Sequence, residues 1–156
     1  MTSEELSDRL RAFLSGIDVE RRFLQMCFDL RDTVRDRVQN AGLNNRDTPF
    51  VPYTPGYAKT RLKKGFQARK VDYTRTGRLW GSIIPEVVSS GDGVVVVEIG
   101  PRGRDNEVKL LGAGTLKPRK DGQLRGLVTL PSERELEDAF TDLVEGILDE
   151  FENVLR

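Results

Sequence analysis

The chain of 156 residues contains no histidine, only one cysteine and no long apolar run. Without histidine the protein lacks the side chain that serves most often as a general base and as a metal ligand. Nucleophiles of the Ser-His or Cys-His type are therefore excluded. Cys27 has no partner for a disulfide within the chain, and a free cysteine usually behaves as a small hydrophobe. We interpret Cys27 as a packing residue rather than a nucleophile.

No stretch of 18 apolar residues occurs, so the sequence predicts no membrane span. The chain begins MTSEELSDRLRAF, which is acidic and polar and unlike a signal peptide. We therefore expect a protein that is not secreted and does not enter a membrane. The length suits one domain. Charged residues make up 32% of the chain, so the core should be modest and much of the surface solvated.

A net charge of zero hides a strong asymmetry along the chain. Residues 59–78 contain eight basic residues and one acid, a net charge of +7, whereas residues 131–156 contain nine acids and two basic residues, a net charge of −7. These stretches are either two solvated surfaces or complementary faces of a self-assembling subunit. Patches of opposite charge steer association and fix its register.

Residues 1–42 are expected to be helical. Thr2 and Glu5 match a capping box, which predicts a helix over residues 3–15. Asp18 has the position of an N-cap before a second, longer helix, and Gly42 follows its expected end near residue 41. Apolar residues recur in this second helix at intervals of three and four, which marks one buried stripe. They are Phe23, Met26, Cys27, Leu30, Val34 and Val38.

Residues 43–76 are predicted to be an extended loop rich in basic and aromatic residues. Loops this long inside a compact domain are uncommon and are usually functional or disordered. One or two helical turns should follow Pro55 and end at Gly65. We expect residues 49–76 to be mobile or irregular in the isolated protein and ordered in an assembly. Their composition cannot bury enough surface to offset the loss of chain entropy.

Residues 77–130 are predicted to form an antiparallel sheet of about four strands. Strand character begins near Gly77 and continues over residues 79–88, and the following Ser-Ser-Gly-Asp-Gly is a strong hairpin signal. Residues 94–99 form the best strand, and their four consecutive valines predict that both sheet faces are covered. Weaker strands are expected at 107–111 and 124–130.

Residues 131–156 are predicted to form a long closing helix that begins with a second capping box, made by Ser132 and Glu135. Its apolar stripe is wide for a small domain. One side should pack on the sheet, and the remainder should face another subunit. The expected fold is therefore α+β, an antiparallel sheet packed against N-terminal helices and a long C-terminal helix.

No catalytic constellation is visible, and the sequence predicts neither an enzyme nor a cofactor nor a metal site. Glu145 and Asp149 are four residues apart on the closing helix, a spacing typical of a solvated helix face. The alternative to a structural role is a nucleic-acid-binding module that uses residues 59–78, where basic residues alternate with aromatic ones. However, the sequence pI of about 6.4 is low for a dedicated nucleic-acid binder.

Residues 76–83 read TGRLWGSI, which resembles the TGxLxxSI sequence that leads into the sheet of tailed-phage tail-completion and neck proteins. These proteins are also called the virion-morphogenesis or lambda Z-like group, which includes head–tail joining proteins. In that family a loop rich in proline and aromatic residues precedes this sequence. Pro49, Phe50, Pro52, Tyr53, Tyr57 and Lys59 stand at its place here.

The resemblance implies a non-enzymatic α+β subunit of a tailed phage or phage-like particle. It implies a homo-oligomeric ring in the neck of the virion, made in the host cytoplasm. The expected partners are other copies of the chain and the tail terminator, tail tube or head connector proteins. Contact with DNA in the lumen would be incidental.

Two sets of residues carry this interpretation. The expected assembly contacts are Phe50, Tyr53, Tyr57, Lys59, Lys63, Lys64, Arg69 and Lys70. The expected structural motif consists of Thr76, Gly77, Leu79, Trp80, Ser82 and Ile83. Because Trp80 and Ile83 are expected to open a strand, their side chains should face the interior, with Leu79 largely covered.

Overall fold

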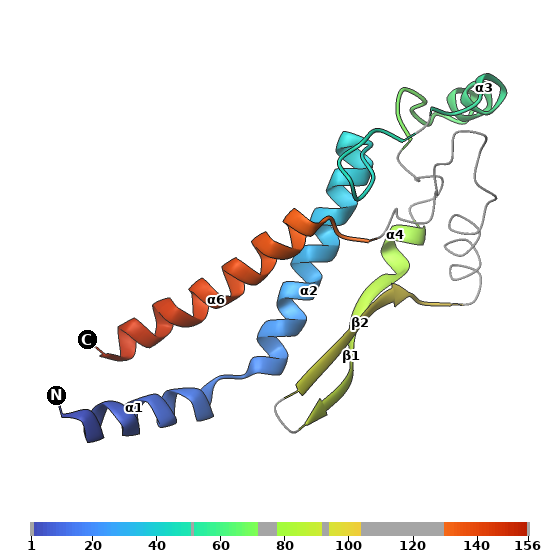
Figure 1. Cartoon of the computed structure of the whole chain (residues 1–156). Coiled ribbons are helices and arrows are strands. Elements are labelled where there is room, and N and C mark those ends of the chain that lie inside the picture. The colour runs from blue at the N-terminus through green and yellow to red at the C-terminus, as the bar shows by residue number, and fades with distance from the viewer. Residues whose placement is uncertain (1, 51, 72–77, 92–93, 104–129, 156) are drawn as a thin grey trace.

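The structure is a computed structural model that describes residues 2–50, 52–71, 78–91, 94–103 and 130–155 (Figure 1). Its longest helices are α2 (Val19–Asp36) and α6 (Glu133–Leu155). The helix α6 and the shorter α1 (Ser3–Gly16) lie on one side of α2, and a two-stranded antiparallel sheet lies on the other side (Figure 1). The predicted α+β class is therefore confirmed.

Both N-terminal helices begin at the predicted caps. The Glu5 backbone N–H donates to Thr2 Oγ1 at 3.2 Å, and the Glu5 carboxylate accepts from the Thr2 backbone at 2.7 Å. Asp18 caps α2 through its side chain, which accepts from the Arg21 backbone N–H at 2.9 Å. The last turn of this long helix widens into a π-helix, η1 (Arg37–Ala41), before Gly42 ends it in the left-handed region, with φ of 70°. The π geometry was not expected, although such turns are frequent at functional sites.

The core lies between the end of α2 and the segment that precedes the sheet. Val38 is fully buried, and Trp80 and Ile83 pack against it with exposed fractions of 5% and 3%. Phe50 is half-buried against the same cluster. The remaining buried apolar side chains of α2 belong to the predicted stripe; they are Met26, Cys27, Leu30 and Val34.

The strand expected from Gly77 onward begins later. Residues 78–82 form a helical turn, α4 (Arg78–Ser82), and the first strand is β1 (Ile83–Gly91). The Ser82 hydroxyl donates to the Leu79 carbonyl at 2.7 Å, a local bond that competes with a sheet ladder. The turn also directs Trp80 and Ile83, three residues apart, toward the same core, whereas a strand would place them on opposite faces.

The strand β1 pairs with β2 (Val94–Pro101), from Ile83 opposite Pro101 to Gly91 opposite Val94, with a register shift after Val87. The prediction that the valines are covered on both faces is wrong, because Val94 and Val96 are exposed. Only one face of this hairpin packs on α2, and residues 94–98 of β2 alternate in exposure. The predicted strands at 107–111 and 124–130 lie outside the described residues, apart from Leu130, which forms a bend.

The closing helix α6 packs against α2 and α1 rather than on the sheet, as Figure 1 shows, which corrects the expected packing. Phe140 lies 6.2 Å from Phe23 of α2, and Phe151 lies 5.1 Å from Phe13 of α1, measured between ring centroids. Much of its apolar stripe remains exposed, at Leu136, Phe140, Val144, Leu148 and Val154. None of the described helices combines the length and apolar character needed to cross a membrane.

The predicted helical turns after Pro55 are present as α3 (Pro55–Lys63). Pro55 occupies the first helical position, where its missing N–H has no consequence, and Gly65 follows the helix with φ of 77°. Residues 43–49 form a small loop closed by a bridge between Leu43 and Pro49. Within the described part of the expected irregular segment, Pro55–Lys63 is therefore a regular helix.

Candidate functional site

The described residues 52–71, here called the basic segment, fold around Arg61, which is buried. Its guanidinium lies 4.6 Å from the ring centroid of Tyr53 and 5.5 Å from that of Phe66, both within the range of cation–π attraction. Its Nε donates to the Gln67 carbonyl at 2.8 Å. Arg61 is therefore an internal support of the segment rather than a charge offered to a partner.

A turn after α3 returns the chain to the body of the protein. The Gln67 side-chain oxygen accepts from the backbone of Arg69 at 2.9 Å and of Lys70 at 3.2 Å. The Lys70 ammonium donates to the Asn40 carbonyl, and its stem lies against Gly42. Any other residue at position 42 would be strained by the positive φ, and its Cβ would lie only 3.1 Å from the Cβ of Lys70. Lys70 thus anchors the segment to η1.

The eight expected assembly contacts separate into two groups. Phe50, Tyr53 and Lys70 contact their own subunit, and the Tyr53 ring meets that of Tyr57 edge-on at 5.2 Å. The other five are exposed; they are Tyr57, Lys59, Lys63, Lys64 and Arg69. We call Lys59, Lys63, Lys64 and Arg69 the basic surface.

The expected structural motif is described from Arg78 onward, and Thr76 and Gly77 lie outside the described residues. Trp80, Ser82 and Ile83 are buried and Leu79 is half-buried. The prediction that Trp80 and Ile83 face the interior is therefore confirmed, although a helical turn and not a strand holds Trp80.

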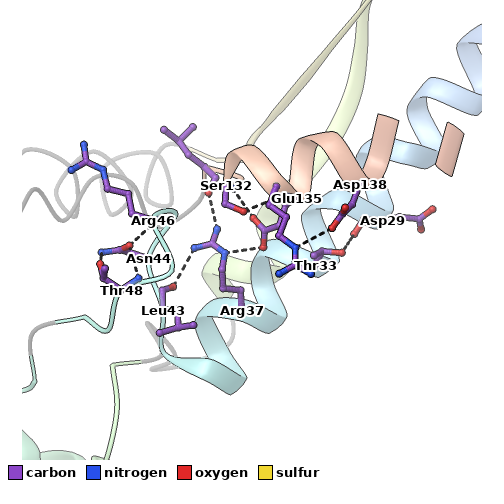
Figure 2. A network of polar contacts seen from close by, with 12 residues as sticks. Asp29, Thr33, Arg37, Leu43, Asn44, Arg46, Thr48, Ser132, Glu135 and Asp138 are labelled. Atoms are coloured by element: carbon purple, nitrogen blue, oxygen red, sulfur yellow. Dashed lines mark hydrogen bonds and ion pairs between the residues drawn. The ribbon is translucent and has the colours of Figure 1, made fainter. Parts of the chain in front are cut away.

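A buried ion pair fixes the start of α6 to the end of α2 (Figure 2). Arg37 Nε lies 2.8 Å from Glu135 Oε1, and the two side chains are 7% and 11% exposed. The same guanidinium donates to the carbonyls of Leu130 at 2.8 Å and Leu43 at 3.2 Å. One arginine thereby joins α2, the loop that follows η1 and the chain that leads into α6.

Glu135 has a second role as part of the predicted capping box. Its other carboxylate oxygen accepts from the Ser132 backbone at 2.7 Å, and its own N–H donates to Ser132 Oγ at 3.2 Å. The box was predicted but the partner Arg37 was not. A signal was present, because Arg37 follows Val34 by three residues on the buried stripe, and a charge at such a position requires a partner.

A groove of about 330 Å³ runs between α2 and α6. Its apolar lining consists of Met26, Leu30, Ala139, Leu143 and Gly146. Its polar lining is mainly acidic and includes Asp29, Asp138, Asp142 and Glu135, with Arg22 at one end. We call this feature the α2–α6 groove and the carboxylates of Asp29, Asp138 and Asp142 its rim.

Arg22 and Glu150 form an ion pair between the first turns of α2 and the last turns of α6. The hydrogen bond from Arg22 lowers the pKa of Glu150, and the same bond raises the pKa of Arg22. An ion pair between an arginine and a glutamate of α6 thus lies at each end of the contact between the two helices: Arg22 of α2 with Glu150, and Arg37 of η1 with Glu135.

The Glu150 contribution should depend on pH. A carboxylate whose pKa is lowered by folding stabilises the native state above its unfolded pKa of about 4.3 and loses that contribution as the pH falls through the folded pKa. Glu150→Gln should therefore lower the urea midpoint slightly at pH 7 and have a smaller effect at pH 3, where more of the carboxylate is protonated. An equal loss at both pH values would contradict an ionic contribution.

Cys27 is buried on α2, and burial raises the pKa of its thiol. We expect the folded protein to react with a thiol reagent at pH 8 far more slowly than the urea-unfolded chain, because the thiolate is the reactive form. The measurement is the rate of a disulfide-exchange colour reaction with and without urea. Equal rates would show that Cys27 is accessible and would contradict its assignment as a packing residue.

Within the described parts of the chain, no group of three or more Cys, Asp or Glu side chains is placed to hold a metal ion. Glu145 and Asp149 are exposed on α6. Comparison of the chain with known protein families, curated proteins and solved structures found no match.

Proposed function

We propose that this chain is a non-enzymatic structural subunit of a tailed phage or phage-like particle, which forms a ring and acts in tail completion or head–tail joining. The observation that carries the proposal is the separation of two complementary surfaces. The basic surface lies on and after α3, and the acidic residues lie along α6, away from α3 in Figure 1. Complementary surfaces that are separated within one subunit can pair head-to-tail, and such contacts close into rings when the rotation permits.

The exposed apolar side chains of α6 support the same proposal. Phe140, Val144 and Leu148 recur at intervals of four and therefore follow one side of the helix. Centres of protein–protein interfaces are apolar, and ion pairs at a solvated rim contribute only about 0–1 kcal/mol each. Apolar contacts would hold the ring, and the charges would set its register.

The resemblance of residues 76–83 to the neck-protein sequence supplies the finer assignment. On this proposal the sheet is completed to about four strands by residues 107–111 and 124–130. The partners are the tail terminator, the tail tube or the head connector, and the protein resides in the virion after its synthesis in the host cytoplasm. Contact with DNA in the lumen is incidental.

The alternative function, nucleic-acid binding through residues 59–78, is favoured by the exposed Tyr57 ring beside the basic surface. Two other aromatic rings of the region, Tyr53 and Phe66, are instead occupied by Arg61. They are less suited to base stacking, which contributes much of the affinity for single strands. A gel-shift at physiological salt with a single-stranded oligonucleotide separates the two functions, since a shift at micromolar protein would favour the alternative.

Charge reversal on the basic surface tests the assembly proposal. We expect Lys63→Glu with Lys64→Glu to leave the circular dichroism spectrum unchanged, because both side chains are exposed. The double variant should fail to form the ring seen with the parent protein, measured by light scattering after gel filtration and by electron microscopy. In vitro joining of tails to heads should be slowed or blocked.

The matched control is Arg11→Glu with Arg46→Glu, which changes the net charge equally at exposed positions outside both surfaces. It should assemble like the parent protein. A parent protein that stays monomeric at its highest soluble concentration would contradict ring formation. Normal assembly of the Lys63, Lys64 variant would remove the basic surface from the mechanism.

A further inference from the structure

The α2–α6 groove is open along its acidic rim and apolar at its base. Met26 and Leu30 of α2 face Ala139 and Leu143 of α6 across it. Its volume of about 330 Å³ is at the lower end of the range of about 300–1,000 Å³ for binding pockets. This size suits one or a few inserted side chains, such as those of a single turn of helix.

The rim carries charge that is poorly balanced within the subunit. Asp29 accepts a hydrogen bond from the neutral Gln25 at 3.0 Å. Among the described residues, Arg134 is the one cation that contacts the rim, 3.6 Å from Asp138 in an exposed pair. Exposed pairs of this kind contribute little and exchange partners at little cost. The groove therefore favours an occupant that is both cationic and apolar.

One described segment of the chain has that combination. Leu62 on α3 is 62% exposed, the highest value among the large apolar side chains of the described residues. Lys59 is three residues before Leu62 and four before Lys63, so it neighbours both side chains on the helix surface. The helix α3 thus presents an exposed apolar side chain next to an ammonium group, with a second ammonium group on the other side of Lys59.

We propose that α3 of one subunit docks in the α2–α6 groove of a neighbouring copy. Leu62 would enter the apolar base, and Lys59 and Lys63 would lie against the rim. In Figure 1, α3 stands apart from α2 and α6, so the helix and the groove of one subunit do not meet. The contact places a short helix of one copy in a groove of the next, and it is head-to-tail. This inference rests on the proposed ring and identifies the interface within it.

Site-specific photo-cross-linking gives a direct test. A benzophenone amino acid replaces Leu62 in the full chain, and this protein is mixed with nitrogen-15-labelled parent protein before irradiation. We expect cross-links from the unlabelled copy to labelled peptides that contain Met26, Leu30, Ala139 or Leu143, identified by mass spectrometry. The same amino acid at Arg46, which is exposed and outside both surfaces, should give no such cross-links.

Compensating charge changes test the rim. Asp138→Lys with Asp142→Lys, and separately Lys59→Glu with Lys63→Glu, should each weaken self-association about tenfold or more, because like charges then face each other. The variant that carries all four changes should regain association close to that of the parent. Circular dichroism checks the fold of each variant, and sedimentation velocity measures the association.

The outcomes separate this interface from the ring itself. The α3–groove contact would be overturned if rings form normally but position 62 cross-links to other surfaces and the four combined changes give no rescue. That result would leave the ring proposal intact. A parent chain that never forms oligomers would overturn the ring and the interface together. Cross-links within the groove and rescue by the combined changes are the results that support the interface.

Discussion

Arg37→Ala should lower the free energy of unfolding by about 3–5 kcal/mol, the usual cost of breaking a buried ion pair by removing one partner. The substitution leaves the Glu135 carboxylate almost buried and without its cation. It also removes the donors to the Leu43 and Leu130 carbonyls. Because this guanidinium joins three segments, the start of α6 should detach first. Urea unfolding monitored by circular dichroism measures the loss.

Arg134→Ala is the matched control, since Arg134 also pairs with a carboxylate near the start of α6 but is 85% exposed. Its effect should stay within about 0.5 kcal/mol, as for most surface substitutions. The double variant Arg37→Met, Glu135→Leu should be much less damaging than Arg37→Ala, because it leaves no buried charge behind. Equal midpoints for Arg37→Ala and Arg134→Ala would show that the buried pair does not secure α6.

Trp80→Ala should cost about 3–5 kcal/mol and Ile83→Ala about 2–5 kcal/mol, the ranges for large-to-small changes in a core. Both side chains pack on Val38, the one described large side chain with no exposed surface, and Phe50 closes the cluster. Each truncation should leave a cavity beside α2, because the short turn α4 cannot move far enough to fill it. Val94→Ala on the same hairpin is the control, because Val94 is exposed and should change stability by less than about 0.5 kcal/mol.

Trp80 is the only tryptophan, so its fluorescence reports on this core in the Ile83→Ala protein. Circular dichroism serves for Trp80→Ala. If the urea midpoints of both variants match that of the parent, residues 76–83 do not form the structural motif assigned to them, and the resemblance to neck proteins would lose its physical basis. A loss confined to Ile83→Ala would place Trp80 outside the cooperative core.

Helix positions were predictable because their signals are local. Thr2, Asp18 and Ser132 cap the helices that they were expected to cap, and the stripe of α2 is buried as its spacing indicates. Hydrogen bonds between residues three apart depend on few other parts of the chain. The same reasoning failed at residues 78–82, where β-propensity favoured a strand. Packing of Trp80 and Ile83 on one core overrode that weaker preference.

Packing between elements was harder to predict. The wide apolar stripe of α6 indicates that another element packs on this helix, but it does not indicate which element. The helix α2 offers one side to the hairpin and another to α6, so α6 contacts α2 where the sheet was expected. The pairing of Arg37 with Glu135 joins residues 98 positions apart, and no local pattern encodes such a distant partner.

The candidate site shows the same limit. Basic residues cluster along residues 59–78 of the sequence, but sequence alone does not distinguish charges that face solvent from charges used internally. Arg61 lies between two aromatic rings, and Lys70 bonds to the Asn40 carbonyl. Alternating basic and aromatic residues suggested a site for base stacking. At Arg61 these residues instead contact each other and stabilise the segment. Among the described residues, the basic side chains of the cluster that remain exposed are Lys59, Lys63, Lys64 and Arg69.

The distance along the chain between α2 and α6 has a consequence during synthesis. Glu135 is made 98 residues after Arg37, so at roughly 5–20 residues per second about 5–20 s separate the two on the ribosome. Through this interval Met26 and Leu30 lack their cover from α6, and the groove between the two helices does not yet exist. If α3 docks in this groove as proposed, a chain whose translation stops before α6 can offer α3 to another copy but cannot accept one. On that proposal such a product would be unable to extend a growing oligomer, and the order of synthesis would exclude incomplete subunits.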